Sequence, residues 1–291
     1  MSSPTSPTSQ QPPPAPKSPP PASILSTPLA KTYATIHPFL LLTLLAIRFN
    51  ALVSSPVDTL LRDLLPLAAL QLAYVVICLP PAGTIDPGTT AESTTTTPTP
   101  TDEKEKEKKS SSSSAGGIVL RPGKRGYRRK AHGASSGARG AIMAKVAASL
   151  LSLALTTLLA TPVLAVCLVL FGAPLTTHHL ETVLCAAHMA LLAATGLVYV
   201  YGVDGAAWKE VWGVLRPADA VWGAALGTCV GAWFGAVPIP LDWDRPWQAY
   251  PITILIGAYI GYFVGSFVGR SSCVFGKRIV IDANEGENKD E

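Results

Sequence analysis

The chain alternates between long apolar runs and polar breaks, and six of the runs are long enough to cross a bilayer. A transmembrane helix needs about 20 mostly apolar residues to cross roughly 30 Å of hydrocarbon. The runs lie at residues 35–54, 59–80, 147–171, 179–202, 219–239 and 251–270. Their length and continuity predict an all-α membrane protein with six transmembrane helices.

The polar stretches contain too few apolar residues to repay the entropy of ordering a chain. The N-terminal stretch is dominated by Pro, Ser and Thr, and the long break after the second run combines a Lys/Glu/Ser tract with RPGKRGYRRKAHG. The expected organisation is a disordered cytoplasmic tail at 1–30, transmembrane helices 1 and 2 within 31–80, a low-complexity cytoplasmic insert at 81–140, transmembrane helices 3 to 6 within 141–270, and a cytoplasmic C-terminal tail at 271–291.

A shorter pattern lies between the fourth and fifth runs. Trp208, Val211, Trp212 and Leu215 follow i, i+3, i+4 and i+7 spacing. This spacing predicts a short amphipathic helix that lies in the membrane interface. The alternative is an ordinary loop that carries interfacial tryptophans.

Charge sets the expected orientation. Charged residues make up only 14% of the chain, against about 25% in soluble domains. The net charge of +4 describes a block between residues 102 and 130 and its neighbours, not a nucleic-acid-binding face. Lys and Arg concentrate on the side shared by the termini and the insert, whereas the opposite loops offer only Arg62 and Arg245. Cytoplasmic loops retain positive charge, so the loop after the fifth run is expected in the lumen.

The last two runs carry glycine at every fourth position. Such ladders leave a groove along one helix face and let another helix approach closely. Either the two ladders pack on each other, or one of them docks a helix of a partner protein. The ladder residues are Gly223, Gly227, Gly231, Gly235, Gly257, Gly261, Gly265 and Gly269.

The loop between these two runs is rich in proline, aromatic and charged residues. Its prolines can end one helix and start the next, and its tryptophans fit an aromatic belt. The remaining polar groups could contact a phosphorylated headgroup or the luminal face of a partner, although an internal Asp–Arg pair is the simpler alternative. The candidate contact residues are Asp242, Trp243, Asp244, Arg245, Trp247 and Gln248.

Ionisable residues inside apolar runs are costly and are therefore candidates for function. Arg48 lies near the end of the first run and Asp63 near the start of the second. An antiparallel hairpin would bring them together, so an ion pair that joins the two helices is favoured. The alternative is a polar path for lipid that includes Arg245.

A histidine cluster, His178, His179, Glu181 and His188, could indicate a metal site or a proton relay. It lacks H-E-x-x-H spacing, and interfacial histidines commonly act as polar anchors. The cysteines show no C-x-x-C spacing, and the chain has no phosphate loop or nucleophile elbow. We therefore expect no catalytic, cofactor-binding or metal-binding residues. The first residues also lack the pattern of a cleaved signal.

The run PIPLDWDRPWQ at 238–248, within the longer stretch 231–265, closely resembles the PIG-F family of glycosylphosphatidylinositol (GPI) anchor biosynthesis proteins, including its fungal members. The resemblance is strong over the last two runs, whereas the first four agree only in number and hydrophobicity. It implies a multi-pass protein of the endoplasmic reticulum membrane that is not itself an enzyme. In that family the partner is a large ethanolamine-phosphate transferase subunit, which transfers phosphoethanolamine from phosphatidylethanolamine to anchor mannoses.

The leading hypothesis is a subunit that stabilises and positions such a transferase. The alternative is a lipid-handling protein that presents phosphatidylethanolamine or GPI intermediates. An autonomous transferase is least favoured, because the expected luminal loops are too short to house one. The sequence does not identify the transferase, the mannose, the role of the 81–140 insert or a retention signal.

Overall fold

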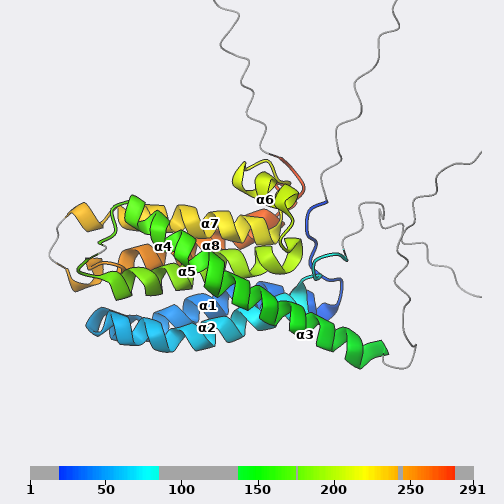
Figure 1. Ribbon diagram of the computed structural model, residues 1–291, viewed down its shortest axis with the longest axis horizontal. Helices are drawn as coiled ribbons and strands as arrows, with labels where there is room; N and C mark the ends of the chain where they lie inside the picture. The colour runs from blue at the N-terminus through cyan, green and yellow to red at the C-terminus, as the bar shows by residue number, and fades with distance from the viewer. Residues whose placement is uncertain (1–19, 85–136, 175, 242–244, 279–291) are drawn as a thin grey trace, which may run out of the picture.

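The computed structural model describes residues 20–84, 137–174, 176–241 and 245–278, and every regular element in these ranges is helical (Figure 1). The elements are α1 (Pro28–Ser54), α2 (Pro56–Cys78), α3 (Gly137–Leu155), the π-helical segment η1 (Thr156–Ala160), α4 (Thr161–Leu170), α5 (His179–Tyr201), α6 (Gly205–Trp212), α7 (Ala220–Ala236), the 3₁₀ turns η2 (Ile239–Leu241) and η3 (Pro246–Gln248), and α8 (Ile252–Arg270).

Five helical rods are long and apolar enough to cross a membrane: α1, α2, the continuous rod Arg139–Leu170, α5 and α8. The expected span at 219–239 corresponds to α7, which is apolar but has only 17 residues. At 1.5 Å per residue α7 covers about 26 Å, slightly less than the hydrocarbon thickness. The all-helical membrane class is therefore confirmed, and five of the six expected spans meet the length criterion.

Two expected boundaries shift in the structure. α1 begins at Pro28, where Thr27 caps the helix by accepting a hydrogen bond from the N–H of Ala30 at 3.3 Å. α3 begins at Gly137, so the last residues of the expected insert belong to a helix. Residues 1–19, 85–136 and 279–291, which hold most of the expected tails and insert, lie outside the described residues.

The expected amphipathic helix is present as α6, so the loop alternative is wrong. Asp204 caps the start of α6. The helix ends at Trp212, where the N–H of the next residue, Gly213, donates to the carbonyl of Lys209, so Leu215 lies beyond the helix. The Trp208 indole N–H donates to the carbonyl of Gly202 at 2.9 Å, which fixes the ring.

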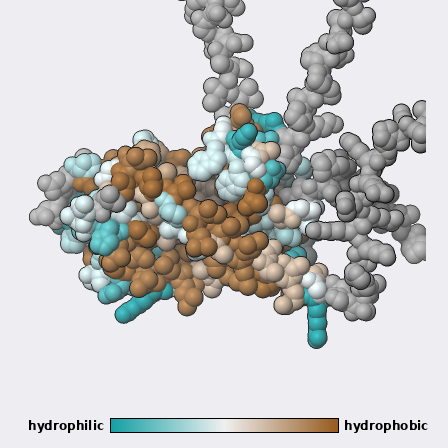
Figure 2. All heavy atoms as spheres, in the orientation of Figure 1, coloured by the Kyte–Doolittle hydropathy of each residue, from teal (hydrophilic) through white to brown (hydrophobic). Residues whose placement is uncertain are grey.

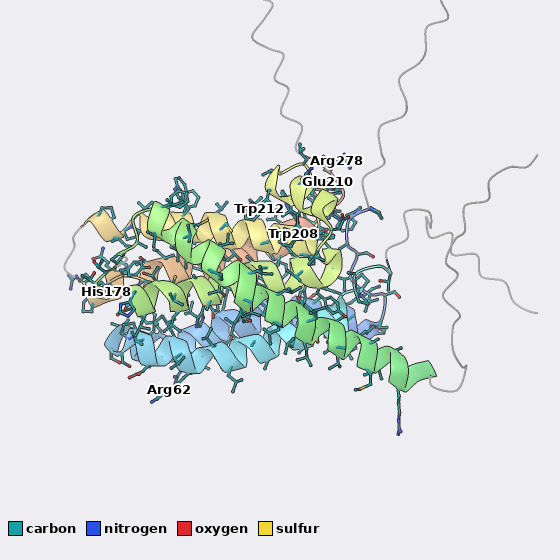
Figure 3. All side chains as sticks on the ribbon, in the orientation of Figure 1. Arg62, His178, Trp208, Glu210, Trp212 and Arg278 are labelled. Carbon is teal, nitrogen blue, oxygen red and sulfur yellow. The ribbon has the colours of Figure 1, made fainter. Side chains whose placement is uncertain are left out.

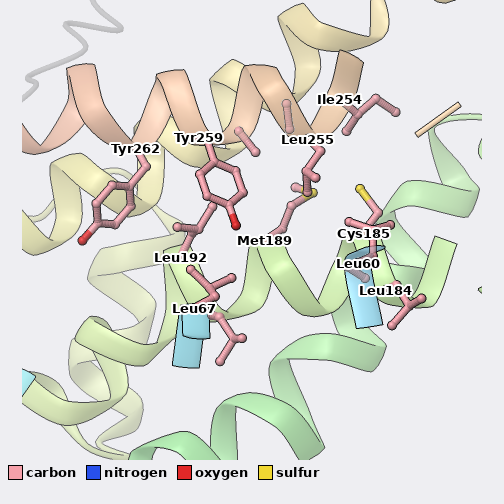
Figure 4. Close-up of a cluster of buried hydrophobic side chains, with 14 of the residues drawn as sticks. Leu60, Leu67, Leu184, Cys185, Met189, Leu192, Ile254, Leu255, Tyr259 and Tyr262 are labelled. Atoms are coloured by element: carbon pink, nitrogen blue, oxygen red, sulfur yellow. The ribbon is translucent and has the colours of Figure 1, made fainter. Parts of the chain in front are cut away.

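α5 is the central helix of the bundle. Its most apolar 18-residue window is 78% buried, against 11% for the Arg139–Leu170 rod. It packs against α2, the rod, α7 and α8, whereas α1 packs on α2 and α8. Figure 4 shows one core cluster, in which Leu60 and Leu67 of α2 meet Met189 and Leu192 of α5 and Leu255 and Tyr259 of α8.

The two ends of the bundle differ in what they carry. A belt of hydrophobic side chains crosses the middle of the molecule, with polar side chains gathered toward its ends (Figure 2). We call one end the basic end; it contains residues 20–27, 79–84, 202–219 and 271–278, and Figure 3 labels Glu210 and Arg278 there. The opposite end contains the α1–α2 turn, residues 171–178 and the α7–α8 loop, and Figure 3 labels Arg62 and His178 there.

Candidate functional site

The two glycine ladders pack on each other. A Cβ added to Gly261 would overlap the backbone carbonyl of Gly227, and one added to Gly227 would overlap the carbonyl of Gly261. The same reciprocal contact joins Gly231 to Gly257. Backbone-to-backbone contact of this kind requires glycine on both helices and allows Cα–H···O contacts to form. The two ladders thus face each other, which is the first of the two arrangements that the sequence left open.

The outer side of the α7–α8 hairpin remains open. An apolar groove of about 750 Å³ runs along the hairpin seam; we call it the hairpin groove. Side chains that project from both helices form its rims, and they are substantially exposed: Val230 is 43%, Phe234 62%, Ile260 49% and Val264 50% exposed. Glycine backbone forms its floor, so the groove is a direct consequence of the ladders.

The α7–α8 loop contributes to one end of this groove. Pro238 and Trp247 line it, and Trp247 is 38% exposed. Arg245 is also exposed, whereas Gln248 turns inward and its amide nitrogen donates to the carbonyl of Pro238 at 3.4 Å. Among the candidate contact residues, Arg245 and Trp247 are thus accessible, Gln248 braces the loop, and Asp242, Trp243 and Asp244 lie outside the described residues.

Tyr250 anchors the same loop to α5. Its hydroxyl donates to the Thr182 hydroxyl at 2.8 Å, and the Thr182 hydroxyl lies 2.9 Å from the carbonyl of His178. Burial raises the pKa of Tyr250 to about 12, outweighing the opposite effect of the Thr182 hydrogen bond. The phenol therefore stays protonated and able to donate at any physiological pH.

The expected histidine cluster is divided between two places. His178 Nδ1 lies 3.3 Å from Glu181 Oε1 at the opposite end. His188 is buried in the core, where its ring nitrogens contact the Tyr259 hydroxyl at 3.1 Å and the Leu60 carbonyl at 3.0 Å. Within the described residues no three His, Cys, Asp or Glu side chains are arranged to hold a metal ion.

The expected ion pair between the first two helices is confirmed. Arg48 Nε lies 3.0 Å from Asp63 Oδ1, and the Asp63 side chain is only 14% exposed. The pair joins α1 to α2 close to their connecting turn. Both charged groups are therefore accounted for by packing of the hairpin.

Sequence analysis missed a buried carboxylate at the basic end. Asp219 is fully buried and accepts hydrogen bonds from the N–H groups of Ala22 at 3.0 Å, Val221 at 2.9 Å and Trp222 at 2.8 Å, and from the Tyr201 hydroxyl. Its position just before α7 is a recognisable N-cap signal, but the Ala22 contact joins residues 197 positions apart. Asp219 thus ties the N-terminal segment to the start of α7.

Arg216 lies next to this carboxylate. Its guanidinium stacks 3.6 Å above the centre of the Tyr201 ring, and Nη1 lies 3.4 Å from Glu210 Oε2 of α6. The side chain is completely buried. Arg216 therefore connects α6 to the end of α5, a role that its place in a loop sequence did not indicate.

Sequence analysis also missed a polar cluster inside the bundle. The His37 ring of α1 stacks on Tyr74 of α2 with centroids 4.5 Å apart, and its Nδ1 lies 3.4 Å from the Tyr262 hydroxyl of α8. Arg270 then donates to the carbonyl of Ala34 at 2.7 Å. Polar groups that contact one another within apolar spans hold helices together, and here they join α1, α2 and α8.

These features define an α-helical membrane protein whose accessible sites, among the described residues, include an apolar groove and the loop at its end. The model of the GPI biosynthesis protein family Pig-F matches residues 36–270, which covers every described helix except the first turns of α1. The chain belongs to this family, as the resemblance of residues 238–248 indicated. It is therefore a GPI-anchor biosynthesis protein.

Individual relatives agree with this assignment. The chain is 61% identical over 267 residues to glycosylphosphatidylinositol anchor biosynthesis protein 11 of Aspergillus fumigatus, a match that covers 91% of this chain and 88% of that protein. It is 41% identical over 258 residues to the Neurospora crassa protein of the same name, covering 89% of this chain and 80% of that one.

A more distant relative has a more informative name. The human protein called GPI ethanolamine phosphate transferase, stabilizing subunit, is 39% identical over 99 residues, which cover 32% of this chain and 45% of the human protein. No solved structure gives a significant match to the chain.

Proposed function

We propose that this chain is a non-catalytic subunit of the endoplasmic reticulum membrane that stabilises and positions an ethanolamine-phosphate transferase in GPI-anchor biosynthesis. Family membership and the name of the human relative support this role. The structural observation that carries it is the hairpin groove, an apolar surface along the whole α7–α8 seam that the described residues leave unfilled. The groove would receive membrane helices of the large transferase subunit.

The contact surface differs from the one that the ladders alone suggested. The glycines of α7 contact the backbone of the glycines of α8, so they form the floor of the groove and do not contact a partner directly. Association of membrane helices depends on close van der Waals packing, because lipid is as apolar as the helices themselves. A preformed groove with projecting Val, Ile and Phe rims offers such packing without any rearrangement of the hairpin.

The orientation of the bundle supports a luminal role for the loop. The basic end carries Lys209 and Lys277, and Lys31 and Arg270 lie in the helix turns beside it, which favours placement of this end in the cytoplasm. With α7 extended by η2 as the sixth span, the α7–α8 loop then lies in the lumen. There Trp247, which belongs to both the loop and the hairpin groove, would place the transferase beside its lipid donor and glycolipid acceptor.

Groove-blocking variants test this proposal. Ile260→Trp and Val264→Trp add bulk to rim positions that are half exposed, so the fold should survive while a docked helix is displaced. We expect each variant to lower co-purification of the large subunit in mild detergent by about tenfold, equivalent to ~1.4 kcal/mol of lost association energy.

A matched control is Leu65→Trp on α2, which is 79% exposed and lies outside the groove. It should co-purify the large subunit as the unmodified chain does. Undiminished recovery of the large subunit with both groove variants would reject the groove as the docking surface.

The lipid-handling alternative has less support. Its proposed polar path needs Arg48 and Asp63 to be available, but these two residues bind each other. Turnover or scrambling of lipid by the purified chain in vesicles would be required to restore it.

A further inference from the structure

A second apolar cavity, of about 530 Å³, lies beside α5, whereas no residue of α5 lines the hairpin groove. We call it the α5 cleft and define it by Leu159, Leu164, Ala194, Leu197, Trp208 and Ala225. The Arg139–Leu170 rod and α7 both pack on α5, but they pack little on each other. The α5 cleft is the wedge between these two helices, and only Trp222 and Leu226 of α7 line both the cleft and the hairpin groove.

α6 closes the wedge at the basic end (Figure 1). Trp208 is held in place by its hydrogen bond to Gly202, and its ring lines the cleft. Trp212 also lines it and is 69% exposed, which places it at the mouth (Figure 3). Tryptophans of this kind are typical of the level of lipid headgroups.

The depth of the cleft corresponds to one leaflet. On α5 the lining runs from Ala193 to Val198 and continues after the helix with Gly202 and Val203; from Ala193 to the helix end at Tyr201 the rise is about 12 Å at 1.5 Å per residue. Half of a hydrocarbon core of roughly 30 Å is about 15 Å, so the end of the helix and the two residues after it together cover nearly one leaflet. The cleft therefore begins at the interfacial helix and ends near the middle of the bilayer.

Water cannot fill this space favourably. A buried water needs two to four polar partners. Within the described residues, none of the buried side-chain polar atoms that lack a hydrogen-bond partner belongs to a residue that lines the cleft. The Trp208 N–H is already bonded to Gly202. Hydrocarbon is the only component of a membrane that matches such walls.

We propose that the α5 cleft binds one acyl chain of a bilayer glycerophospholipid. The glycerol and headgroup lie beside α6, where the exposed cation of Lys209 flanks the apolar helix face and can contact the lipid phosphate. The acyl chain extends between η1 and α7. It packs against both elements and fills the space that separates them. The inference requires that these helices span a bilayer, but not that a transferase is present.

Positional photolabelling of the purified full-length chain tests the proposal. The protein is reconstituted in phosphatidylcholine vesicles that contain a trace of phosphatidylcholine with a diazirine in one acyl chain. A diazirine near the chain terminus should label Leu164 and Cys229 at the deep end, and one near the glycerol should label Trp208 and Trp212. Equal labelling of these residues and of lipid-facing Leu65 with either probe would overturn the inference.

Cleft-filling variants provide the second measurement. Ala194→Phe and Ala225→Phe each place a ring in the cleft and should reduce its labelling by about tenfold, since displacing two methylene groups from an apolar site weakens binding by roughly that factor. Ala154→Phe, at an exposed position of the Arg139–Leu170 rod outside the cleft, is the control of equal size change and should not alter the labelling.

Unchanged labelling of Leu65 shows that a variant is still folded and embedded. Undiminished cleft labelling in both Phe variants would reject the assignment. So would release of a co-purifying protein by these variants without loss of lipid label, because that result would make the cleft a protein-binding surface. If either variant fails to reconstitute, the depth-dependent labelling of the unmodified chain still decides the question.

Discussion

Asp219 is the residue on which the contacts of the basic end converge. Its carboxylate receives donors from the N-terminal segment, α5 and α7, three parts of the chain that are separated in sequence. A fully buried carboxylate is tolerated only when hydrogen bonds satisfy it, as they do here. Removing the side chain would leave several buried donors without an acceptor.

We therefore expect Asp219→Ala to lower the free energy of unfolding by about 2–4 kcal/mol, the combined effect of a lost helix cap and unsatisfied buried donors. The measurement is thermal unfolding in detergent. Asp204→Ala is the matched control, because Asp204 caps α6 at an exposed position and should cost only ~1 kcal/mol. Equal effects of the two substitutions would show that the additional contacts of Asp219 contribute nothing.

At the scale of elements, the α7–α8 hairpin is the most closely packed pair in the bundle. The sequence predicted its ladders, and the observed contacts show why the period must be four on both helices: each glycine lies opposite backbone of the other helix. A side chain on either ladder would meet backbone, which cannot move aside as a flexible side chain can.

Gly261→Ala should accordingly destabilise the protein by about 1–3 kcal/mol, because its Cβ overlaps the carbonyl of Gly227 and the helices must separate. Gly205→Ala meets open space at the start of α6 and should be neutral or slightly stabilising. Thermal unfolding of the two variants under identical detergent conditions measures the difference. A Gly261→Ala protein as stable as the Gly205→Ala protein would contradict the contact.

At the scale of the whole molecule, the distribution of charge separates the two ends. The basic end gathers both described terminal segments together with α6, and the opposite end holds the α7–α8 loop. The positive-inside rule then predicts a cytoplasmic basic end.

Cysteine accessibility in sealed microsomes tests this orientation. Cys273 is exposed at the basic end and should react with a membrane-impermeant maleimide without permeabilisation. An Arg245→Cys substitution, at an exposed loop position, should react only after the membrane is opened. Labelling of the Arg245→Cys site in intact vesicles would invert the topology and remove the luminal role of the loop.

Features that depend on neighbouring residues were predicted well. Span positions follow from apolar run length, α6 from the spacing of Trp208, Val211 and Trp212, and the Arg48–Asp63 pair from the hairpin that joins two consecutive spans. The main errors lie at helix starts, because the cap at Thr27 and the early start of α3 precede the strongly apolar residues.

Contacts between distant segments were beyond the reach of these arguments. The sequence placed His188 in an interfacial cluster. In the structure it points into the core and contacts Tyr259, 71 positions later in the chain. The hydrogen bond between Ala22 and Asp219, the stack of His37 on Tyr74 and the α5 cleft likewise depend on which helices become neighbours.

Apolar length and glycine period are local properties that act through the bilayer and through backbone geometry, so composition and spacing alone predict the membrane class and the helix faces that allow close packing. The family followed from the resemblance of residues 238–248, which the family model matches. Which faces of the helices remain unpaired depends on how all of them are arranged around α5. Since lipid favours no apolar face over another, packing alone leaves the hairpin groove and the α5 cleft open, and only the folded bundle reveals them.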